Sequence, residues 1–410
     1  MERAVITGMG VVSPIGTGIA DFSERMFAGR HGIVPVDHFD TEEMSVKVHA
    51  SVSGFDPEEH FSVTERRRLD RHVMLGMVAA REAVAQSGIA GEIDPYRFGV
   101  HMTTGLGGTG TMLTEHELML ERGPRRVAPM LIPKWIPNMI SGLVSIDTGA
   151  RGQSMAHNTA CASSAVSIGE GLRAIRHGYA DAVICGGAEA TTYQLVMAGF
   201  QSLRALSTAT DPDRASIPFD RERGGFVMAE GGAALVLESE SHARARGARI
   251  LGVVSGYGIT SDASHITAPA ADGEAIGRAI KDALAEAEAT NGEADGPLHV
   301  NAHGTGTVLN DRAEALTIER VLGEDTVVTS TKSMTGHMLG AAGAVETIAS
   351  VLALDAGRIP PTAGTQQIDE DMHIDVVLGE TREQQLQRAL SLSLGFGGHN
   401  AVVVIDRELV

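Results

Sequence analysis

Short apolar runs alternate with amphipathic segments along the whole 410-residue chain, and this alternation limits the possible folds more than any other feature. Apolar runs without polar alternation are typical of strands in a sheet that is covered on both faces. They predict strands over residues 3–8, 181–187, 299–303, 326–330 and 401–405. Apolar residues at helical spacing predict helices over 162–177 and 274–289. The sequence therefore predicts an α/β protein with helices layered on a sheet.

Two segments rich in small residues suggest internal duplication. One follows Cys161 (ASSAVSIGEGLRAI) and the other follows His337 (MLGAAGAVETIAS). Small side chains allow helices to pack closely at the centre of a protein, but two unrelated buried helices would look the same, so this pattern alone leaves both interpretations open. The charged stretch 240–251 is a possible seam. At roughly 150 residues per domain, the length fits two or three domains or one duplicated unit.

The net charge of −19 argues against a nucleic-acid-binding protein, because phosphate binding needs a basic surface. No apolar run approaches the roughly 18–20 residues of a membrane span, so no membrane association is expected. The N-terminus enters an apolar strand directly, without the organisation of a signal peptide. The chain has only two cysteines, too few for a disulfide framework, and a cytoplasmic location is expected.

Two apparent ligand motifs are discounted. The segment Gly105–Gly110 fits G-x-G-x-x-G, but the acidic residue of a dinucleotide site is missing about 20 residues on, where a loop is expected. His299 and His303 have the spacing of metal ligands on a helix. They lie on an expected strand, however, where residues four apart are about 13 Å apart, too far for one metal ion. Neither a metal nor an organic cofactor is expected.

The best candidate for a nucleophile is Cys161, at the start of an expected helix. A helix N-terminus stabilises a thiolate and lowers the cysteine pKa. A buried structural cysteine is the alternative, and it suits Cys185 better, since that residue lies within a strand. Three further segments, 300–307, 330–337 and 395–400, place histidines at strand-to-loop ends, where α/β folds collect chemistry.

Several long segments, in this order, resemble the β-ketoacyl-acyl carrier protein synthases, condensing enzymes of the thiolase-like superfamily. They are AVITGMGVVSPIG, TACASSA, DAVICGGAEA, IPFDRERGGFVMAEGGAALVLE, VNAHGTGT, STKSMTGHMLGAAGAVE and GFGGHN. The resemblance runs from end to end. It implies a five-layered αβαβα fold with two pseudo-duplicated halves, residues 1–250 with the nucleophile and residues 251–410 with two catalytic histidines.

The resemblance also implies roles for individual residues. Cys161 would accept the acyl group, His303 and His337 would act as a pair, and Lys332 and Glu346 would support them. The backbone N–H groups of Cys161 and Phe396 would form an oxyanion hole, and Phe396 would also be a gate. The implied reaction is decarboxylative Claisen condensation of an acyl group on Cys161 with malonyl-acyl carrier protein, giving 3-ketoacyl-acyl carrier protein and CO₂.

The Cys–His–His set favours an elongating synthase over other members of the superfamily. Thiolases have a second cysteine near the C-terminus, initiating synthases use Asn in place of the second His, and silent chain-length subunits lack the nucleophile. Fatty acid and polyketide roles stay open, with a slight lean to polyketide. GFGGHN resembles actinobacterial fatty acid synthases. Leu394 departs from those enzymes, which usually have Phe at this position, and GTGTVLND (304–311) resembles polyketide ketosynthases. The alternative is a non-catalytic carrier-binding or chain-length-type subunit.

The expected partners are an acyl carrier protein with its phosphopantetheine thioesters and a second subunit, in a homodimer or in a heterodimer with a related chain-length subunit. The residues expected to bind substrate are Leu106, Met130, Leu131, Thr305, Thr307, Gly397 and Gly398. The residues expected to dock the acidic carrier are Arg66, Arg67, Arg68, Arg71, Arg125, Arg126 and Arg204. Ion pairs on a solvated helix face are the alternative for the first cluster, since Glu65 and Asp70 lie beside it.

Overall fold

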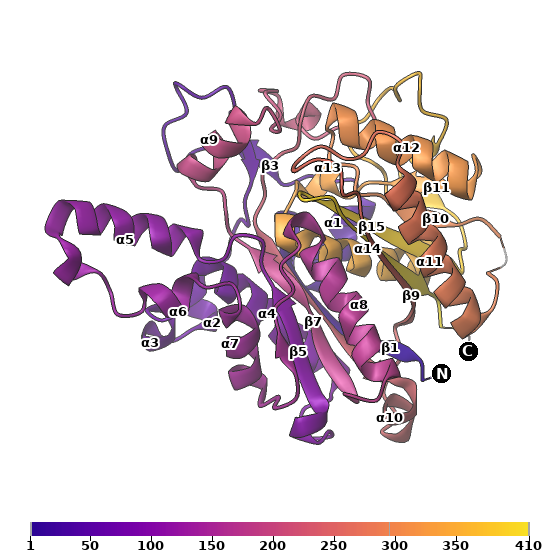
Figure 1. Cartoon of the computed structure of the whole chain (residues 1–410), viewed down its shortest axis with the longest axis horizontal. Coiled ribbons are helices and arrows are strands. Elements are labelled where there is room, and N and C mark those ends of the chain that lie inside the picture. Colours follow the sequence, from indigo (N-terminus) through magenta and orange to yellow (C-terminus); the bar gives the residue numbers. More distant parts are fainter. Residues whose placement is uncertain (1, 295, 409–410) are drawn as a thin grey trace.

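The structure, a computed structural model, describes residues 2–294 and 296–408. Among them, strands from both ends of the chain join one 12-stranded sheet (Figure 1). Eleven of these strands follow the path β13-β11-β10-β15-β16-β9-β1-β8-β7-β5-β6, and the twelfth, β2 (Gly16–Thr17), pairs with β1 beside it. The first half contributes β1 (Ala4–Ser13), β5 (Phe98–Thr103), β6 (Ser154–Met155), β7 (Ala182–Glu189) and β8 (Gly231–Ser239). The second contributes β9 (Gly252–Ser261), β10 (His299–Asn301), β11 (Val327–Thr329), β13 (Asp375–Val376), β15 (Arg388–Gly395) and β16 (His399–Asp406).

The two halves repeat one topology. In the first, β5 is parallel to β6 and β7, and β8 is antiparallel to β7 and β1. In the second, β10 is parallel to β11 and β15, and β16 is antiparallel to β15 and β9. A short antiparallel ladder between β1 and β9 joins the halves. The predicted thiolase-like fold with two similar halves is confirmed, whereas the division into units 1–250 and 251–410 stays a prediction.

Glycines allow equivalent helices to pack against equivalent strands. Helix α4 (Arg71–Ser87) lies on β1, and α11 (Glu274–Asn291) lies on β9. A Cβ added at Gly10 would sit 2.0 Å from the carbonyl oxygen of Ala79, and one at Gly258 would sit 1.9 Å from that of Ala279. Both approaches exclude any side chain at these positions, so the same constraint operates twice in one chain.

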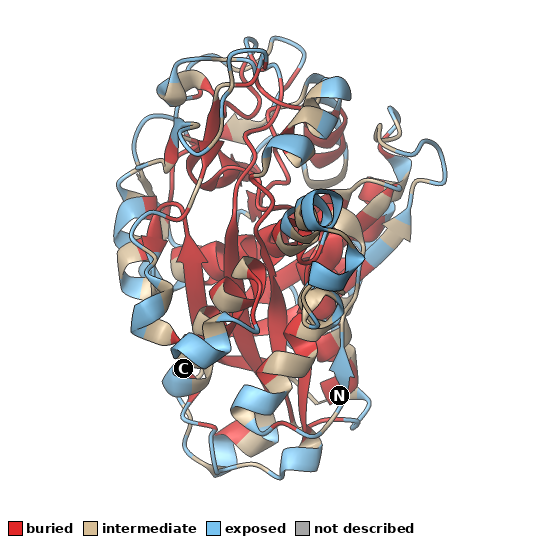
Figure 2. Cartoon of the chain, turned by 90° about the vertical axis from the view of Figure 1, so that its left-hand side faces the viewer, coloured by how far each residue is buried: buried red, intermediate tan, exposed pale blue. Residues whose placement is uncertain are grey.

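Two buried helices form the central layer. They are α8 (Ser163–Arg176) and α14 (Ala342–Ala356), which contact each other as well as strands of both halves. The outer layers include α4, α7 (Met139–Thr148), α11 and α12 (Val308–Leu322). Figure 2 shows the strands and the central helices buried and the outer helices exposed along one side. The small residues noticed in the sequence let α8 and α14 pack between the two halves of the sheet.

One apolar segment has the length and hydropathy of a membrane span. It covers Leu339–Ala356, and 83% of it is buried inside the fold, as in a core helix. The expectation that no apolar run approaches this length was therefore wrong. The segment is apolar on all sides because α14 is surrounded by protein in the central layer.

The predicted strands and helices are present with shifted ends. The strand expected over 299–303 ends at Asn301, where the chain leaves the sheet for the loop that carries His303. The remaining helices are α1 (Ile19–Phe27), α2 (Pro57–His60), α3 (Val63–Arg66), α5 (Thr109–Arg122), α6 (Leu131–Trp135), α9 (Gln194–Ser202), α10 (Glu240–Ala245) and α13 (Lys332–Thr335). The remaining strands are β2 (Gly16–Thr17), β3 (Ile33–Pro35), β4 (Val48–Ala50), β12 (Arg358–Ile359) and β14 (Arg382–Glu383).

Candidate active site

Cys161 lies in a 3₁₀ turn, Ala160–Ala162, that leads directly into α8. The turn is strained, since Ala160 has a φ of 51° in the left-handed region. Ser163 holds it closed, because its hydroxyl donates to the Ala160 carbonyl at 2.6 Å and accepts from the Thr159 N–H at 2.8 Å. The second half repeats this geometry: Leu339, with a φ of 43°, opens the 3₁₀ turn before α14. The strained turn fixes the direction of the thiol.

The Cys161 thiol is buried, with 8% exposure. Burial raises its pKa to about 12, while the charge of Lys332 and the backbone N–H of Phe396 act in the opposite direction. The expectation of a lowered pKa at a helix start was therefore wrong, because desolvation outweighs the favourable groups. Cys185 is fully buried in β7, as expected for a structural cysteine.

His303 is fixed in position through hydrogen bonds from the backbone to a buried carboxylate. The carboxylate of Glu314, on α12, accepts hydrogen bonds from the N–H of His303 at 2.6 Å and from that of Gly304 at 2.8 Å. Glu314 is fully buried, and this burial raises its pKa to about 8. A single carboxyl group thus fixes the loop that follows β10 and directs the imidazole inward.

His337 approaches from the loop after α13. Its backbone N–H donates to the Val227 carbonyl at 2.8 Å. Its ring meets that of Phe226 edge to face, with centroids 5.1 Å apart. The rings of His303 and His337 also meet edge to face, with centroids 5.3 Å apart. Two imidazoles from adjacent strand ends are thereby brought together.

A buried ion pair lies behind the histidines. Lys332 and Glu346 are bonded directly, and their side chains are 2% and 3% exposed. Burial raises the pKa of Glu346 to about 7 against the opposing effect of Lys332. Burial first, and then the charge of Lys332, lower the pKa of both His303 and His337 well below the usual value. Both imidazoles are therefore neutral near pH 7 and can donate one N–H each.

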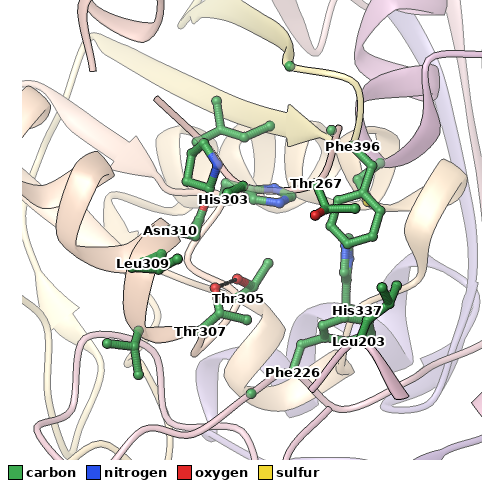
Figure 3. A pocket seen from close by; sticks show the side chains of 18 of the residues that line it. Leu203, Phe226, Thr267, His303, Thr305, Thr307, Leu309, Asn310, His337 and Phe396 are labelled. Carbon is green, nitrogen blue, oxygen red and sulfur yellow. Dashed lines mark hydrogen bonds between the residues drawn. The ribbon is translucent and has the colours of Figure 1, made fainter. Parts of the chain in front are cut away.

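These groups open into one cavity of about 280 Å³ (Figure 3). Cys161, His303, His337 and Phe396 all line it. In Figure 3, Phe396, His337 and Phe226 lie on one side of the cavity, with Thr305, Thr307 and Leu309 opposite. Thr305 and Thr307 bond to each other through their hydroxyl groups at 3.0 Å. Together these residues form a largely apolar chamber with few polar groups.

The expected substrate residues divide into two groups. Thr305, Thr307 and Gly398 line the cavity, and Gly397 follows Phe396 in the same turn. Leu106, Met130 and Leu131 are not among the residues that line it. Leu106 is 42% exposed and the other two are half-buried. Their role in a substrate pocket stays a prediction.

The expected docking arginines also differ from one another. Arg66 pairs with Glu58, and Arg71 forms two bonds, of 2.6 and 2.7 Å, with the buried carboxylate of Glu230. Both arginines therefore form ion pairs, although with Glu58 and Glu230 rather than with the neighbouring Glu65 and Asp70. The remaining ones are exposed: Arg67, Arg68, Arg125, Arg126 and Arg204. Arg204 also lines the cavity.

Some site residues were missed from the sequence. Glu189, fully buried at the end of β7, accepts from the N–H of Gly105 at 2.7 Å and of Gly340 at 3.0 Å. The loop Gly105–Gly110, which fits the dinucleotide motif, thus has a backbone N–H bonded to the carboxylate of Glu189. Glu314 was also missed, and so were Phe226 and the loop 262–269, which line the cavity or fix its walls. An acidic residue ending an apolar strand, as in GGAEA, was a usable signal for Glu189.

The fold and the site define a condensing enzyme of the acyltransferase type with a thiolase-like architecture. Residues 1–243 match the model of the β-ketoacyl synthase N-terminal domain, and residues 251–366 match that of its C-terminal domain. The chain belongs to the β-ketoacyl synthase family.

Curated relatives and solved structures agree with this assignment. The chain is 43% identical to 3-oxoacyl-[acyl-carrier-protein] synthase 2 of Staphylococcus aureus, over 99% of this chain and 98% of that protein. It is 41% identical to the protein of the same name from Vibrio cholerae, over 99% of each. Among solved structures, a β-ketoacyl synthase from Burkholderia phymatum has a TM-score of 0.91 at 31% identity, and the ishigamide ketosynthase/chain length factor has 0.91 at 34%, each over all of both chains.

Proposed function

We propose that this chain condenses an acyl group on Cys161 with malonyl-acyl carrier protein, giving 3-ketoacyl-acyl carrier protein and CO₂. The proposal rests on one observation: Cys161, His303 and His337 line the same buried cavity, and both imidazoles are neutral there. The names of the curated relatives support the substrate class. The complete Cys–His–His set speaks against a non-catalytic carrier-binding or chain-length-type subunit.

The first step is transfer of the acyl group to the enzyme. The sulfur of Cys161 attacks the carbonyl carbon of the acyl thioester, and the thiol proton leaves with the carrier's phosphopantetheine thiol. The N–H groups of Cys161 and Phe396 stabilise the oxyanion of the tetrahedral intermediate. The thiol is neutral in the free enzyme, so its deprotonation accompanies the attack.

The second step is decarboxylation of the malonyl thioester. The bond between C2 and the carboxylate breaks, CO₂ leaves, and the electron pair moves into an enolate whose negative charge lies on the thioester oxygen. His303 and His337 each donate an N–H to that oxygen. C2 then attacks the acyl carbonyl on Cys161 and the carbon–sulfur bond breaks. The Cys161 thiolate released in this way takes a proton from water, which restores the neutral thiol. Neutral imidazoles suit this role, because they stabilise the developing charge without transferring a proton to the carbanion.

The test is a defined reaction with acyl-carrier protein and malonyl-carrier protein as the only substrates. Mass spectrometry of the carrier should show the 3-ketoacyl chain, with one CO₂ released for each chain formed. Acyl transfer without a new carbon–carbon bond would contradict the proposal and favour a carrier-binding subunit.

Fatty acid elongation and polyketide elongation differ in what the enzyme does with its own product. The curated relatives favour the first, since they are named 3-oxoacyl-[acyl-carrier-protein] synthase 2. Polyketide elongation stays a candidate function because of Leu394, which lines the cavity beside Phe396. A solved relative at 30% identity and a TM-score of 0.89 is a type II ketosynthase in complex with its acyl-carrier protein. Without any reductase, a fatty acid enzyme should stop after one condensation, whereas a polyketide enzyme should extend the unreduced chain.

The proposed partners are the acyl carrier protein and a second subunit. Solved relatives include a ketosynthase with its carrier and the ishigamide ketosynthase/chain length factor. A fatty acid enzyme would pair with a second copy of this chain, and a polyketide enzyme with a related subunit. Light scattering of the purified chain separates the two, because a heterodimeric enzyme needs its partner to reach the size of a dimer.

A further inference from the structure

Three potential metal ligands meet beside the β3–β4 hairpin, and none of them lines the catalytic cavity. In this hairpin Val34 lies opposite His49. Asp37 and His38 follow β3 after one intervening residue, Val36. One ligand atom from each of Asp37, His38 and His49 lies within 4.8 Å of the others. Figure 1 shows β3 near α9, which bounds the same region.

The ring of His38 is oriented as in a metal-binding histidine. Its Nε2 lies 2.6 Å from the backbone carbonyl of Thr192, which can only accept a hydrogen bond, so Nε2 carries the proton. In the neutral ring the lone pair is then on Nδ1, which lies 3.6 Å from Oδ1 of Asp37. Histidine ligands commonly donate their second N–H to a backbone carbonyl in this way, which fixes the tautomer and the ring orientation.

His49 supplies an independent indication. It is 2% exposed, and within residues 2–294 and 296–408 neither of its ring nitrogens has a hydrogen-bond partner. Its ring lies 4.9 Å from that of His38 between centroids. The nearby Glu230 is already bonded to Arg71 and to the N–H of Val52.

We propose that Asp37, His38 and His49 form a binding site for a divalent transition-metal ion such as Zn²⁺ or Co²⁺. Two imidazoles and a carboxylate suit these borderline ions rather than Mg²⁺ or Ca²⁺. Ligand atoms around a tetrahedral ion, at about 2.1 Å from the metal, lie roughly 3.4 Å from one another. The 3.6 Å between Asp37 and His38 is close to this value. The Asp37 side chain is 89% exposed and free to rotate into place, and the open side leaves a fourth position for water.

A bound ion would tie the segment after β3 to β4, and His38 is already bonded to the carbonyl of Thr192, just before α9. Phe39, next to His38, packs against a cluster that contains Cys161, and Phe200 on α9 packs there as well. The Phe200 ring lies 6.1 Å from that of Phe396. The ion would therefore stiffen a wall of the catalytic region without taking part in the condensation. Since it binds the folded chain only, it should raise the melting temperature.

The test uses Co²⁺, whose visible absorption reports its ligands, on the full chain at pH 7.5. The unmodified chain should bind one Co²⁺ with the absorption of a four-coordinate nitrogen and oxygen site. Asp37→Asn and His49→Phe should each weaken Co²⁺ binding by at least roughly 10–100-fold. Loss of a group that only hydrogen-bonds to a metal ligand already costs this much affinity, so loss of a ligand itself should cost no less. Asp37→Asn changes an exposed side chain, so it tests the site even where His49→Phe disturbs folding. Asp40→Asn, an exposed acid on the same loop, is the matched control and should bind as the unmodified chain does.

Three results would overturn the proposal. The first is no Co²⁺ binding by the unmodified chain. The second is binding that Asp37→Asn leaves unchanged. The third is an absorption band of a cobalt–thiolate bond that disappears in Cys161→Ala, which would place the ion in the catalytic cavity. Zn²⁺ should compete with Co²⁺ for the site. The Co²⁺ absorption is measured without substrates, so this test does not depend on the condensation activity.

Discussion

His303 and His337 meet edge to face, with ring centroids 5.3 Å apart and ring planes inclined by 86°. They come from the ends of neighbouring parallel strands in the second half of the chain, while Cys161 reaches the same cavity from the first half. Each histidine is fixed through its backbone, one by Glu314 and the other by Val227. The site therefore depends on the packing of the two halves as much as on the reactive side chains.

The first prediction concerns the nucleophile. Cys161→Ala should abolish the covalent acyl adduct and the condensation, because Cys161 is the cysteine that lines the cavity. The fold should survive such a small change. Cys185→Ala is the matched control: it should keep the adduct, although it leaves a small cavity in β7. Intact-mass measurement after incubation with acyl-carrier protein reads out both variants, and an adduct that persists on Cys161→Ala would refute the assignment.

The second prediction separates acyl transfer from decarboxylation. In the proposed mechanism His337 donates to the enolate oxygen, so in His337→Ala the release of CO₂ from malonyl thioester should fall by roughly 10²–10³-fold. Acylation of Cys161 should continue, because the oxyanion hole proposed for that step is made of backbone groups. Single-turnover assays of each step provide the comparison. Normal decarboxylation with lost acylation would reverse the proposed roles.

Sequence patterns predicted the parts of the site that follow strand ends. His303 and His337 were identified because their segments follow apolar strands and enter Gly- or Ser-rich loops, and Cys161 because it begins a helix of small residues. The resemblance then supplied Lys332 and Glu346, whose pairing the structure shows directly. Local sequence was informative here, since a strand end fixes where a side chain can point.

Other parts depend on contacts between distant residues. Glu189 holds Gly340, and Glu314 holds the loop of His303, and neither partnership leaves a periodic signal in the sequence. The raised pKa of Cys161 also results from burial by the whole fold, which outweighs the local helix start. The wall formed by the loop 262–269 comes from another part of the chain again. Patterns within short windows report neither burial nor long-range hydrogen bonds.

The third prediction concerns the buried ion pair. Lys332→Met should lower the free energy of unfolding by about 3–5 kcal/mol, because it leaves Glu346 buried without its partner. Lys332→Met combined with Glu346→Leu should be less destabilised than Lys332→Met alone, since no unpaired charge remains. Urea unfolding of the unmodified chain, Lys332→Met, Glu346→Leu and the double variant measures this coupling. A double variant with the summed loss of the single changes would show that the pair is not coupled.

The fourth prediction is a pH dependence of stability. The pKa of Glu314 is raised to about 8 in the folded chain, so between its ordinary value of 4.5 and 8 the unfolded chain releases a proton that the folded chain keeps. Stability from this group is therefore full below pH 4.5 and is lost as the pH rises through 8. Glu314→Gln cannot titrate, so its stability relative to the unmodified chain should increase from pH 5 to pH 8. Urea midpoints at both pH values test this, and a constant difference would contradict it.

The last prediction concerns the carrier. An acidic enzyme that receives an acidic carrier protein needs a local basic surface. Arg67 and Arg68 are exposed and form no ion pair within the described part of the chain, in contrast to Arg66 and Arg71, whose charges are paired with carboxylates. They follow α3 directly. Charges at the rim of an interface act mainly on the rate of encounter and on its salt dependence.

Arg67→Glu combined with Arg68→Glu should therefore raise the KM for the carrier-bound substrate, and the effect should shrink as salt is added, because at 0.15 M screening acts over about 8 Å. Acylation by a small thioester without the carrier should not change, since neither arginine lines the cavity. The control is Arg249→Glu combined with Lys281→Glu, which makes the same change in net charge at two other exposed positions outside the cavity. If only total charge matters, both double variants should lose activity with the carrier equally. If the arginines at 67 and 68 support the fold instead, that variant should lose activity with both kinds of substrate. Loss confined to the carrier-bound substrate and to Arg67→Glu with Arg68→Glu is the result expected for a docking surface.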